Sequence, residues 1–396
     1  MFKHMMKLIW NRKGSNGLII AEIVIAFLVV FGVASLGYSN YRLYHQPLGF
    51  KWQGGLHVMI RNGGDWTEED GRALEQALNV LRDNPQIESA SALLFGPFRG
   101  WRSTTNFTFG GKKVDAVQNQ FSDGAHQAMG MELLEGRWTG PEDIGLDWSS
   151  VVINKRLADE LFPGESPLGK NIRPPDEEDQ NYREQRVVGV FTDFRQMGEF
   201  FAESNYVIHR LPIEAHDERA FSLVIYPRPG ASVALQEEIV ETVQRVAPNW
   251  TLKIQEFGAM RDAMLEQVMT PLTVAMLIAG FLILMVGFGL FGVLWQSVTR
   301  RTGELGLRRA MGANRQRIYR QIIAEMCLTA GIALALGIFV AIQFPMLGTF
   351  KVVDWPTAIG GITIGAGIVI ALCFLCSLYP GWLASRRSPA EALHYE

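Results

Sequence analysis

The chain has 396 residues, of which 48% are hydrophobic, and a formal net charge of −3. Residues 40–270 hold 23 Lys and Arg against 34 Asp and Glu, whereas the remainder holds 14 against 6. This split is typical of an acidic aqueous domain attached to a membrane part with basic flanks, and it excludes a nucleic-acid-binding protein, whose folded domain would be basic.

The N-terminal segment predicts a membrane anchor. Residues 1–16 carry basic side chains and no acid, and the apolar run that follows is interrupted only by Glu22. The run is longer than the apolar part of a signal peptide and no small-residue cleavage site follows it. We therefore predict a retained span over residues 17–38 behind a cytoplasmic tail. Glu22, in its cytoplasmic third, is a possible intramembrane polar site, although it can also snorkel or bond a neighbouring helix.

Residues 39–265 are then predicted to lie outside the cytoplasm as an α+β domain. Alternating residues 56–60 indicate a strand, Thr67 with Asp70 forms a capping-box pattern for a helix to about residue 83, and residues 87–94 indicate a second strand. The pattern recurs as a strand over 221–226, a helix capped by Ser232 and a strand over 250–256. The two units predict a split lobe of residues 40–99 plus 216–257, with residues 100–215 as an inserted lobe.

The inserted lobe contains a segment that superficially suggests a nucleotide site. Gly164, Gly169 and Lys170 have the spacing of a phosphate-binding loop, but the motif is one residue short, because Asn171 stands where Ser or Thr would ligate magnesium. We therefore expect no nucleotide site here. The pattern V-x-N-x-x-x-A-x-x-L-F-P-G-E-x-P-L-G-K-x-I-R, followed by V-V-G-V-x-x-D-F, instead resembles the extracytoplasmic core domain of MacB-like permeases.

The residues that commonly carry catalysis show no matching arrangement. The five histidines of the domain lack metal-binding spacing, and no G-x-S-x-G elbow is present. Cys327, Cys373 and Cys376 all lie in apolar runs, so that small packing residues are a better interpretation than a redox or metal site. We expect no catalytic, cofactor-binding or metal-binding residue in this chain.

The C-terminal third predicts three further spans. A stalk and second span cover residues 258–298, the third span covers 322–346, an outer loop covers 347–356, the fourth span covers 357–379, and a cytoplasmic tail covers 380–396. Gly361 and Gly365 form a G-x-x-x-G motif that lets helices approach closely, either within the chain or between copies.

Between the second and third spans lies a basic loop, residues 299–321, which should remain in the cytoplasm together with both termini. Gly312 indicates a helix end and Asn314 a helix cap. We therefore predict a short helix over residues 302–311 and a second helix from Arg315 into the third span. From charge alone, the loop could be no more than a topology signal.

The loop sequence R-T-G-E-L-G-L-R-R-A-M-G-A-N-R, followed by Ile318, Gln321 and Glu325, resembles the signature of MacB/FtsX-like ABC transporter permeases, the type VII or mechanotransmission class. The ending R-R-x-x-P-A-E-A-L-x-Y-E is also similar to theirs. The resemblance implies that the loop docks on a cytoplasmic ABC ATPase. Its contacts would come from Arg301, Glu304, Arg308 and Arg309, with Gly306 and Gly312 shaping the helix and its turn.

Together these features predict an integral membrane α-helical protein with four transmembrane helices and a large α+β extracytoplasmic domain between helices 1 and 2. The resemblance implies a permease subunit in the bacterial plasma (inner) membrane that exports or extrudes a drug, peptide or lipid-like substrate. It implies an ATPase dimer carrying ATP and magnesium, a second permease copy or related permease, and a periplasmic adaptor with an outer-membrane duct. The alternative is a non-transporting regulator of a cell-wall hydrolase or sensor system.

Overall fold

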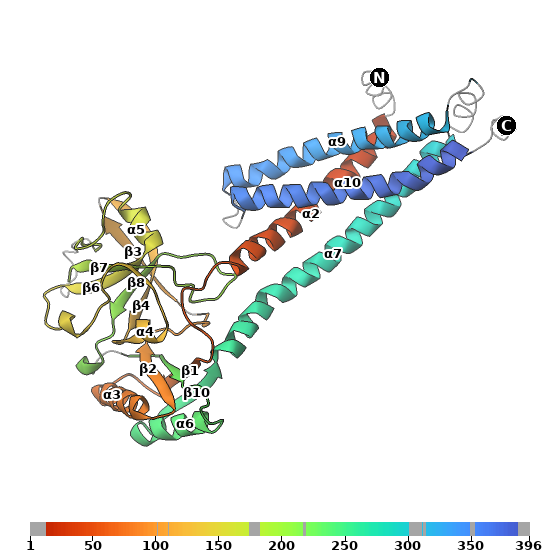
Figure 1. The fold of residues 1–396 in the computed structure, drawn as a ribbon. Coiled ribbons are helices and arrows are strands. Elements are labelled where there is room, and N and C mark those ends of the chain that lie inside the picture. The colour runs from red at the N-terminus through yellow and green to blue at the C-terminus, as the bar shows by residue number, and fades with distance from the viewer. Residues whose placement is uncertain are drawn as a thin grey trace. The chain divides into compact units, whose positions relative to one another are not determined.

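Residues 13–100, 102–109, 111–173, 183–216, 219–300, 311, 314–348 and 353–386 are described by a computed structural model of the chain (Figure 1). The chain divides into two compact units. The helical unit comprises Met1–Arg42 and Met269–Glu396, and the α/β unit comprises Leu43–Val268.

Four long apolar helices account for most of the described part of the helical unit. They are α2 (Lys13–Tyr44), α7 (Phe257–Arg300), α9 (Arg315–Leu347) and α10 (Trp355–Arg386). Each contains an apolar stretch long enough to cross a bilayer, which takes about 20 residues. The predicted architecture of four spans, with a mixed α/β domain between the first and the second, is therefore confirmed.

Glycines allow these helices to pack closely. A methyl group added at Gly361 of α10 would overlap Ser35 of α2, and one at Gly365 would lie 3.5 Å from the backbone nitrogen of Phe31. The G-x-x-x-G motif therefore packs α10 against α2 of the same chain, the first of the two alternatives that the sequence leaves open. α9 and α10 also run side by side (Figure 1).

A ten-stranded mixed sheet forms the α/β unit. Its strands are β1 (Leu56–Asn62), β2 (Ile87–Leu93), β3 (Ser103–Phe109), β4 (Lys112–Phe121), β5 (Leu133–Gly136), β6 (Ser149–Asn154), β7 (Gln185–Phe191), β8 (Tyr206–Arg210), β9 (Ser222–Pro227) and β10 (Trp250–Glu256). Their hydrogen-bonded order is β10-β1-β9-β2-β4-β8-β6-β7-β5, and β3 pairs with β4. The pairs β4–β8 and β6–β7 are parallel, and the other pairs are antiparallel.

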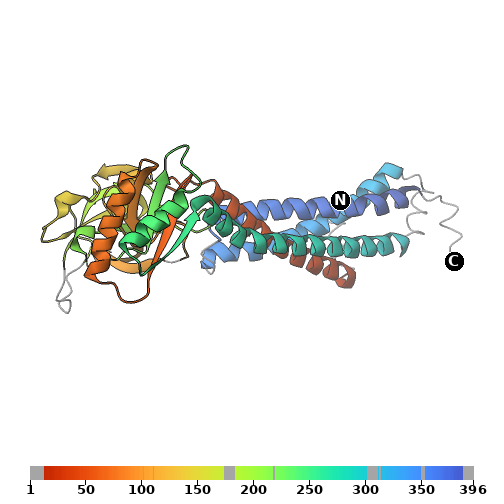
Figure 2. The same ribbon diagram turned by 90° about the horizontal axis from the view of Figure 1, so that it is seen from below.

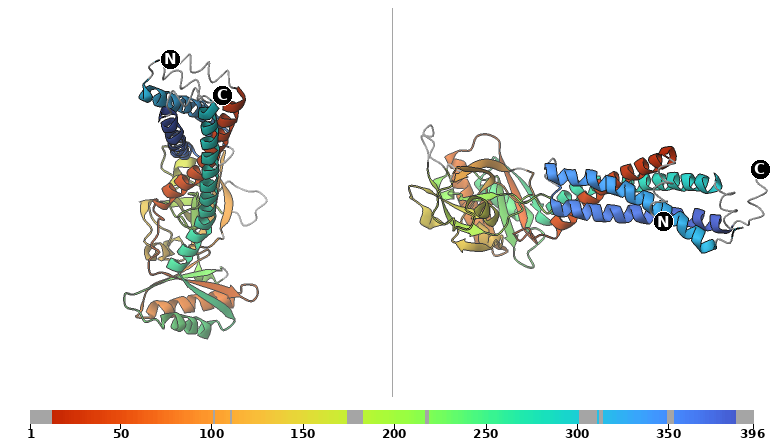
Figure 3. Two further views of the ribbon diagram at one scale, coloured as in Figure 1. Left: turned by 90° about the vertical axis from the view of Figure 1, so that its right-hand side faces the viewer. Right: turned by 90° about the horizontal axis from the view of Figure 1, so that it is seen from above.

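Two helices, α3 (Glu68–Asp83) and α6 (Leu235–Val246), lie beside each other and pack on β1, β2, β9 and β10 (Figures 2 and 3). Leu74 and Leu78 of α3 and Ile239 and Val243 of α6 are buried in the core between helices and strands. The predicted elements β1-α3-β2 and β9-α6-β10 are confirmed. Their strands interleave, because β1 lies between β10 and β9.

The rest of the sheet carries two further cores. α5 (Lys155–Leu161) contributes Leu157 and Leu161 to a core with β3, β4, β6, β7 and β8. The other core is aromatic and includes Phe50, Phe98 and Phe194. The short helix α4 (Ala125–Ala128) and the 3-10 turns η1 (Pro141–Asp143) and η2 (Ile213–Ala215) connect the remaining strands.

One predicted helix boundary is wrong. α6 begins at Leu235 rather than after Ser232, because Ser232 closes a local turn in which its carbonyl accepts from Leu235 N at 3.0 Å and its hydroxyl from Ala234 N at 3.2 Å. The predicted third span, residues 322–346, lies within α9, which ends at Leu347, where Gly348 has a positive φ of 59°.

Candidate functional site

The predicted coupling residues lie outside the described residues: Arg301, Glu304, Gly306, Arg308, Arg309 and Gly312. The predicted helix over residues 302–311 falls there too, apart from Met311. The structure describes the helices on either side, α7 ending at Arg300 and α9 starting at Arg315. The Asn314 side chain caps α9 by accepting from Gln316 N at 3.3 Å, which confirms the predicted start of that helix.

Stacked aromatic rings lie in the last turns of α7 and α10. Trp295 of α7 and Tyr379 of α10 stack with centroids 6.0 Å apart, and Phe291 and Trp382 extend the stack to either side. Trp and Tyr concentrate where a membrane meets water, since their rings are apolar and their edges are polar. The cluster is suited to fix the depth of the two helices near the basic loop. Sequence reasoning missed it, although the spacing of Phe291 and Trp295 places both rings on one helix face.

The intramembrane acid Glu22 lies at a helix–helix contact. A methyl group added at Gly289 of α7 would overlap Glu22 Oε1, so the carboxylate of α2 occupies the space left by this glycine. Among the described residues, no hydrogen bond or ion pair to Glu22 is formed. A carboxylate in an apolar setting is costly without a partner, which keeps Glu22 a candidate polar site between α2 and α7.

An ion pair joins the other ends of two spans. Arg42 Nη1 donates to Asp354 Oδ2 at 3.0 Å, and Asp354 Oδ1 accepts from Thr357 N at 2.9 Å in the first turn of α10. Asp354 thus caps α10 and holds the last turns of α2 at once. Because both side chains are more than a third exposed, the pair contributes orientation more than stability.

An apolar cavity of about 430 Å³ lies among α2, α7 and α10. Nearly all of its wall is aliphatic, with Tyr38 and Tyr41 the residues that bring hydroxyl groups. Its other lining residues are Val30, Val33, Ala34, Gly37, Met276, Ala279, Gly280, Ile283, Ile364 and Ile368. Such a wall can accommodate a hydrocarbon chain, but it offers no charged group to a polar ligand.

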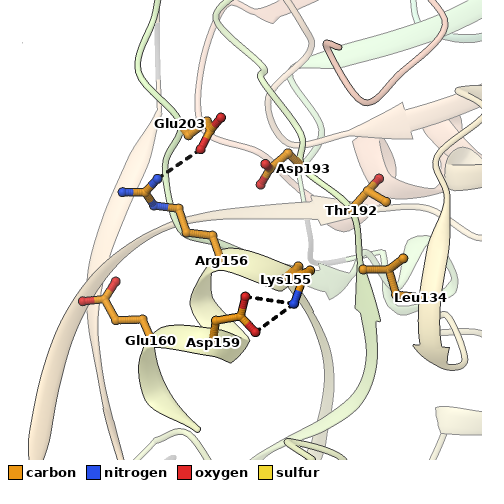
Figure 4. Close-up of a pocket in the computed structure, with 8 residues that line it drawn as sticks. All are labelled: Leu134, Lys155, Arg156, Asp159, Glu160, Thr192, Asp193 and Glu203. Carbon is orange, nitrogen blue, oxygen red and sulfur yellow. Dashed lines mark hydrogen bonds and ion pairs between the residues drawn. The ribbon is translucent and has the colours of Figure 1, made fainter. Parts of the chain in front are cut away.

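The α/β unit has a larger and polar cavity of about 650 Å³ beside α5 (Figure 4). Its cations are already neutralised, because Lys155 pairs with Asp159 at 2.9 Å and Arg156 pairs with Glu203 at 3.1 Å. The lining is completed by Leu134, Glu160, Thr192 and Asp193. Both cations of the lining are thus paired with carboxylates of the same unit.

The glycine segment before Lys170 is not arranged as a phosphate loop. The ammonium group of Lys170 pairs with Glu165 and lies 5.0 Å from the ring centre of Phe162 and 5.3 Å from that of Phe109. Its charge is thereby committed to an acid and two aromatic faces within the α/β unit. A role in packing accounts for this lysine.

The buried histidine His57, like Lys170, has a role in packing. His57 Nε2 lies 2.9 Å from Ser222 Oγ, but the two residues are only 1% and 0% exposed, so a substrate cannot reach them. Burial, helped by Arg99 and Lys253, lowers the pKa of His57 to about 3. Across the part of the chain that the structure describes, no cluster of three His, Cys, Asp or Glu side chains is able to hold a metal ion.

Comparisons with known proteins match two families on successive parts of the chain. Residues 17–243 match the family of MacB-like periplasmic core domains, and residues 276–389 match the FtsX-like permease C-terminal family. The macrolide export ATP-binding/permease protein MacB of Rhodopirellula baltica is 26% identical over 288 residues, which cover 63% of this chain and 41% of that protein.

A second relative aligns over nearly its whole length. The uncharacterized ABC transporter permease YvrN of Bacillus subtilis is 22% identical over 418 residues, covering 98% of this chain and 97% of YvrN. The solved periplasmic region of MacB from Actinobacillus actinomycetemcomitans covers 56% of this chain and 97% of its own length at 16% identity, with a TM-score of 0.39. The chain spans about two fifths of the length of the MacB relatives from Rhodopirellula and Bdellovibrio.

Proposed function

Since the chain belongs to the family of ABC permeases that join a MacB-like periplasmic core domain to an FtsX-like C-terminal part, we propose that it passes the energy of ATP hydrolysis to its α/β unit. In this proposal a separate cytoplasmic ABC ATPase binds the loop of residues 299–321. The helices of this chain then move its α/β unit, which lies outside the cytoplasm, and the chain itself catalyses no reaction.

The observation that carries the proposal is the unbroken helix α7. It starts at Phe257, directly after the last strand of the sheet, and continues to Arg300 at the edge of the basic loop. The helix contains Pro271. In this proposal a displacement at the loop end passes along the helix to the α/β unit. Arg301, Glu304, Arg308 and Arg309 are the proposed ATPase contacts, with Gly306 and Gly312 shaping the loop.

In this proposal the substrate is exported or extruded without passing through a polar channel between the spans. Among the described residues of the apolar stretches, acidic and amide side chains are few. They include Glu22, Glu325, Gln343 and, near an end, Gln296, and Ser and Thr hydroxyls account for most of the other polar groups. A hydrophilic channel requires a lining of polar groups that these helices do not supply. Of a drug, a peptide and a lipid-like molecule, the aliphatic cavity among α2, α7 and α10 favours a substrate with an apolar chain.

We further propose a dimer of permeases, since an ATPase dimer presents two docking sites. α7 offers a surface for the second copy or a related permease, because large apolar side chains along it are exposed within the chain. They include Leu277 (70%), Phe281 (59%), Leu284 (60%) and Phe288 (69%). In a bilayer, such side chains contact either lipid or another helix.

Affinity purification from the native membrane tests the proposal. We expect a tagged chain to bring down an ABC ATPase and a second permease, and the complex to hydrolyse ATP faster than the ATPase alone. Recovery of a periplasmic adaptor and an outer-membrane duct would identify an exporter. Recovery of a cell-wall hydrolase or a sensor kinase in their place would show a regulator. Absence of any ATPase from an intact, dimeric preparation would contradict the proposal.

A further inference from the structure

Two chain segments connect the sheet of the α/β unit to spans, and one loop contacts both. The first segment comprises the last two residues of α2 and the chain that follows, from Leu43 to Trp52. The second is the first turns of α7 from Phe257. The loop comprises residues 193–201, between β7 and β8. All three segments belong to the α/β unit.

Arg195 attaches the loop to the first segment. Its side chain is 4% exposed, and its Nη1 donates to Leu43 O at 2.7 Å and to Gln46 O at 3.3 Å. The last carbonyls of a helix have no partner within the helix and carry partial negative charge, so a guanidinium group is a favourable partner for the end of α2. Nη2 donates to Phe201 O at 3.1 Å and also to Glu199 O, which fixes the far side of the loop.

Glu199 attaches the same loop to the second segment. Its carboxylate accepts from Arg261 Nε in the second turn of α7, with side-chain exposures of 5% for Glu199 and 15% for Arg261. The Arg261 guanidinium group also lies 4.7 Å from the ring centre of Trp52 and 6.0 Å from that of Tyr44, both on the first segment. Arg261 therefore contacts the loop and the first segment at once.

Apolar and backbone contacts complete the connection. The ring of Phe200 stacks on Tyr44 at 6.1 Å, and Arg195 N donates to Leu48 O at 2.9 Å. Gly49 lies so close to the loop that an added methyl group would overlap the carbonyl of Asp193. The loop and the segment after α2 are thus held at several points along nine residues.

From these contacts we propose that residues 193–201 act as a clamp that locks the end of α2 to the start of α7, with Arg195 and Glu199 as its positioning residues. The clamp rests on the proposed function, and it specifies how that function uses the α/β unit. A displacement arriving through α7 then moves the segment after α2 with it, instead of shearing the two segments apart.

The charged residues of the clamp suit a role in fixing geometry better than a role in stabilising the fold. Burying a charged pair costs desolvation that an apolar contact of the same size would not, so such pairs are weak evidence for stability and are better attested as specifiers of geometry. Among the described residues, Arg195 Nε and Glu199 Oε2 have no hydrogen-bond partner. The cluster therefore accepts a cost in stability while it orients both segments.

The test measures distances in the full chain assembled with its ATPase, after the three native cysteines are replaced. Spin labels at Pro47 and Ala263, both exposed, report the spacing of the two clamped segments. A reference pair at Ala263 and Trp355, one label in each unit, reports ATP-driven motion. In the wild type we expect a single Pro47–Ala263 distance in all nucleotide states, while the reference distance changes with ATP.

Glu199→Gln removes the charge but keeps the size of the side chain. We expect its Pro47–Ala263 distance to broaden and to depend on nucleotide, while ATP hydrolysis and the ATP-driven change in the reference distance, which α7 itself carries, continue. Asp123→Asn is the matched control, because it breaks the Arg210–Asp123 pair of the same unit, in which Arg210 is 11% exposed. The control should behave like the wild type.

A covalent replacement separates the clamp from general destabilisation. The Glu199→Cys, Arg261→Cys double variant carries its spin labels at Pro47 and Ala263 on unnatural amino acids, so that both thiols are free for cross-linking. A short bifunctional thiol reagent should restore the single Pro47–Ala263 distance that the uncrosslinked protein lacks. The clamp is overturned if Glu199→Gln leaves the Pro47–Ala263 distance as in the wild type, or if the cross-link does not restore it. A wild type without any ATP-driven change would instead remove the proposed function, and the clamp with it.

Discussion

Single glycines determine how closely the helices of the helical unit approach. Gly289 makes room for the carboxylate of Glu22, Gly337 for the ring of Phe27, and Gly361 for Ser35. Protein interiors are close-packed, and an added methyl group at such a site displaces a neighbour or shifts a helix. On the same helices other glycines face open space, which provides internal controls.

Gly361→Ala should destabilise the helical unit by about 1–3 kcal/mol, because the new methyl group overlaps Ser35. Gly367→Ala on the same helix meets nothing within 4 Å and should be neutral or stabilising by up to about 1 kcal/mol, since Ala is the better helix former. Thermal unfolding of both variants in detergent measures the difference. Equal stability of the two would show that α2 and α10 do not pack as described.

Buried histidines should make the α/β unit sensitive to mild acid. Burial lowers the pKa of His57 to about 3 and, assisted by Arg173, that of His209 to about 4. In the unfolded chain an imidazole binds a proton below about pH 6.5, whereas these two stay neutral in the fold. Above pH 6.5 both histidines are neutral in the folded and the unfolded chain, so they leave the free energy of unfolding unchanged. Below pH 6.5 only the unfolded chain binds the proton, and each histidine lowers the free energy of unfolding by about 1.4 kcal/mol per pH unit until its folded pKa is reached.

The corresponding measurement is hydrogen exchange of the strands β1 and β8 in the full chain between pH 7 and pH 5, corrected for the intrinsic exchange rate. We expect protection to decline toward pH 5, and His209→Gln to decline less steeply than the wild type. His45→Gln, at an exposed position, is the control and should retain the wild-type slope. A wild-type stability independent of pH over this range would contradict the burial of both imidazoles.

At the scale of elements, the sequence predicted those helices whose start or length depends on neighbouring residues alone. Thr67 and Asp70 form the predicted capping box, with Asp70 Oδ2 accepting from Thr67 N at 2.9 Å. The four apolar helices were also predictable, because length and hydropathy are sufficient to identify a span. Ser232 misled, since a serine that closes a turn has the same local signature as one that caps a helix.

Long-range pairing could not be predicted in this way. β3 and β4 alternate polar and apolar residues only weakly, and neither was predicted as a strand. The parallel pairing of β4 with β8 joins segments about ninety residues apart, for which the sequence carries no local signal. The clamp could not be predicted for the same reason, because Arg195, Glu199 and Arg261 come together only once the sheet has formed.

Topology is testable at this scale. Val233, 98% exposed in the loop before α6, and Gln316, exposed in the first turn of α9, should lie on opposite sides of the membrane, because basic segments remain in the cytoplasm. In a cysteine-free background, an impermeant thiol reagent added outside should label Val233→Cys and leave Gln316→Cys unlabelled until the membrane is opened. Labelling in the reverse order would invert the assignment.

Lys170→Ala should leave ATP binding and hydrolysis by the assembled complex unchanged, because the lysine pairs with Glu165 and covers Phe109 and Phe162. The expected effect is a loss of about 1 kcal/mol or less in the stability of the α/β unit, which is the scale of an exposed pair with a cation–π contact. Nucleotide binding by the complex and urea unfolding would measure the two effects separately. A folded variant that no longer binds ATP would revive the phosphate-loop interpretation.

For the whole molecule, the account joins a basic loop, a continuous helix and a mixed α/β unit in one chain. The charge asymmetry supports a loop that remains on the ATPase side, and α7 supports transmission away from it. Residues 301–310 of the loop lie outside the described residues, and a charge reversal tests their proposed role directly. A loop that only sets topology would tolerate any arrangement of its charges.

The most direct measurement is recruitment of the ATPase by the double variant Glu304→Arg, Arg308→Glu. The exchange keeps the net charge of the loop, so insertion and abundance should be normal, while like charges now meet at the partner and can cost several kcal/mol of docking energy. We expect weaker binding of the ATPase, a dependence on salt because exposed charges are screened over about 8 Å, and partial recovery with matched reversals on the ATPase. A double variant that recruits the ATPase and supports movement of the α/β unit like the wild type would contradict the account.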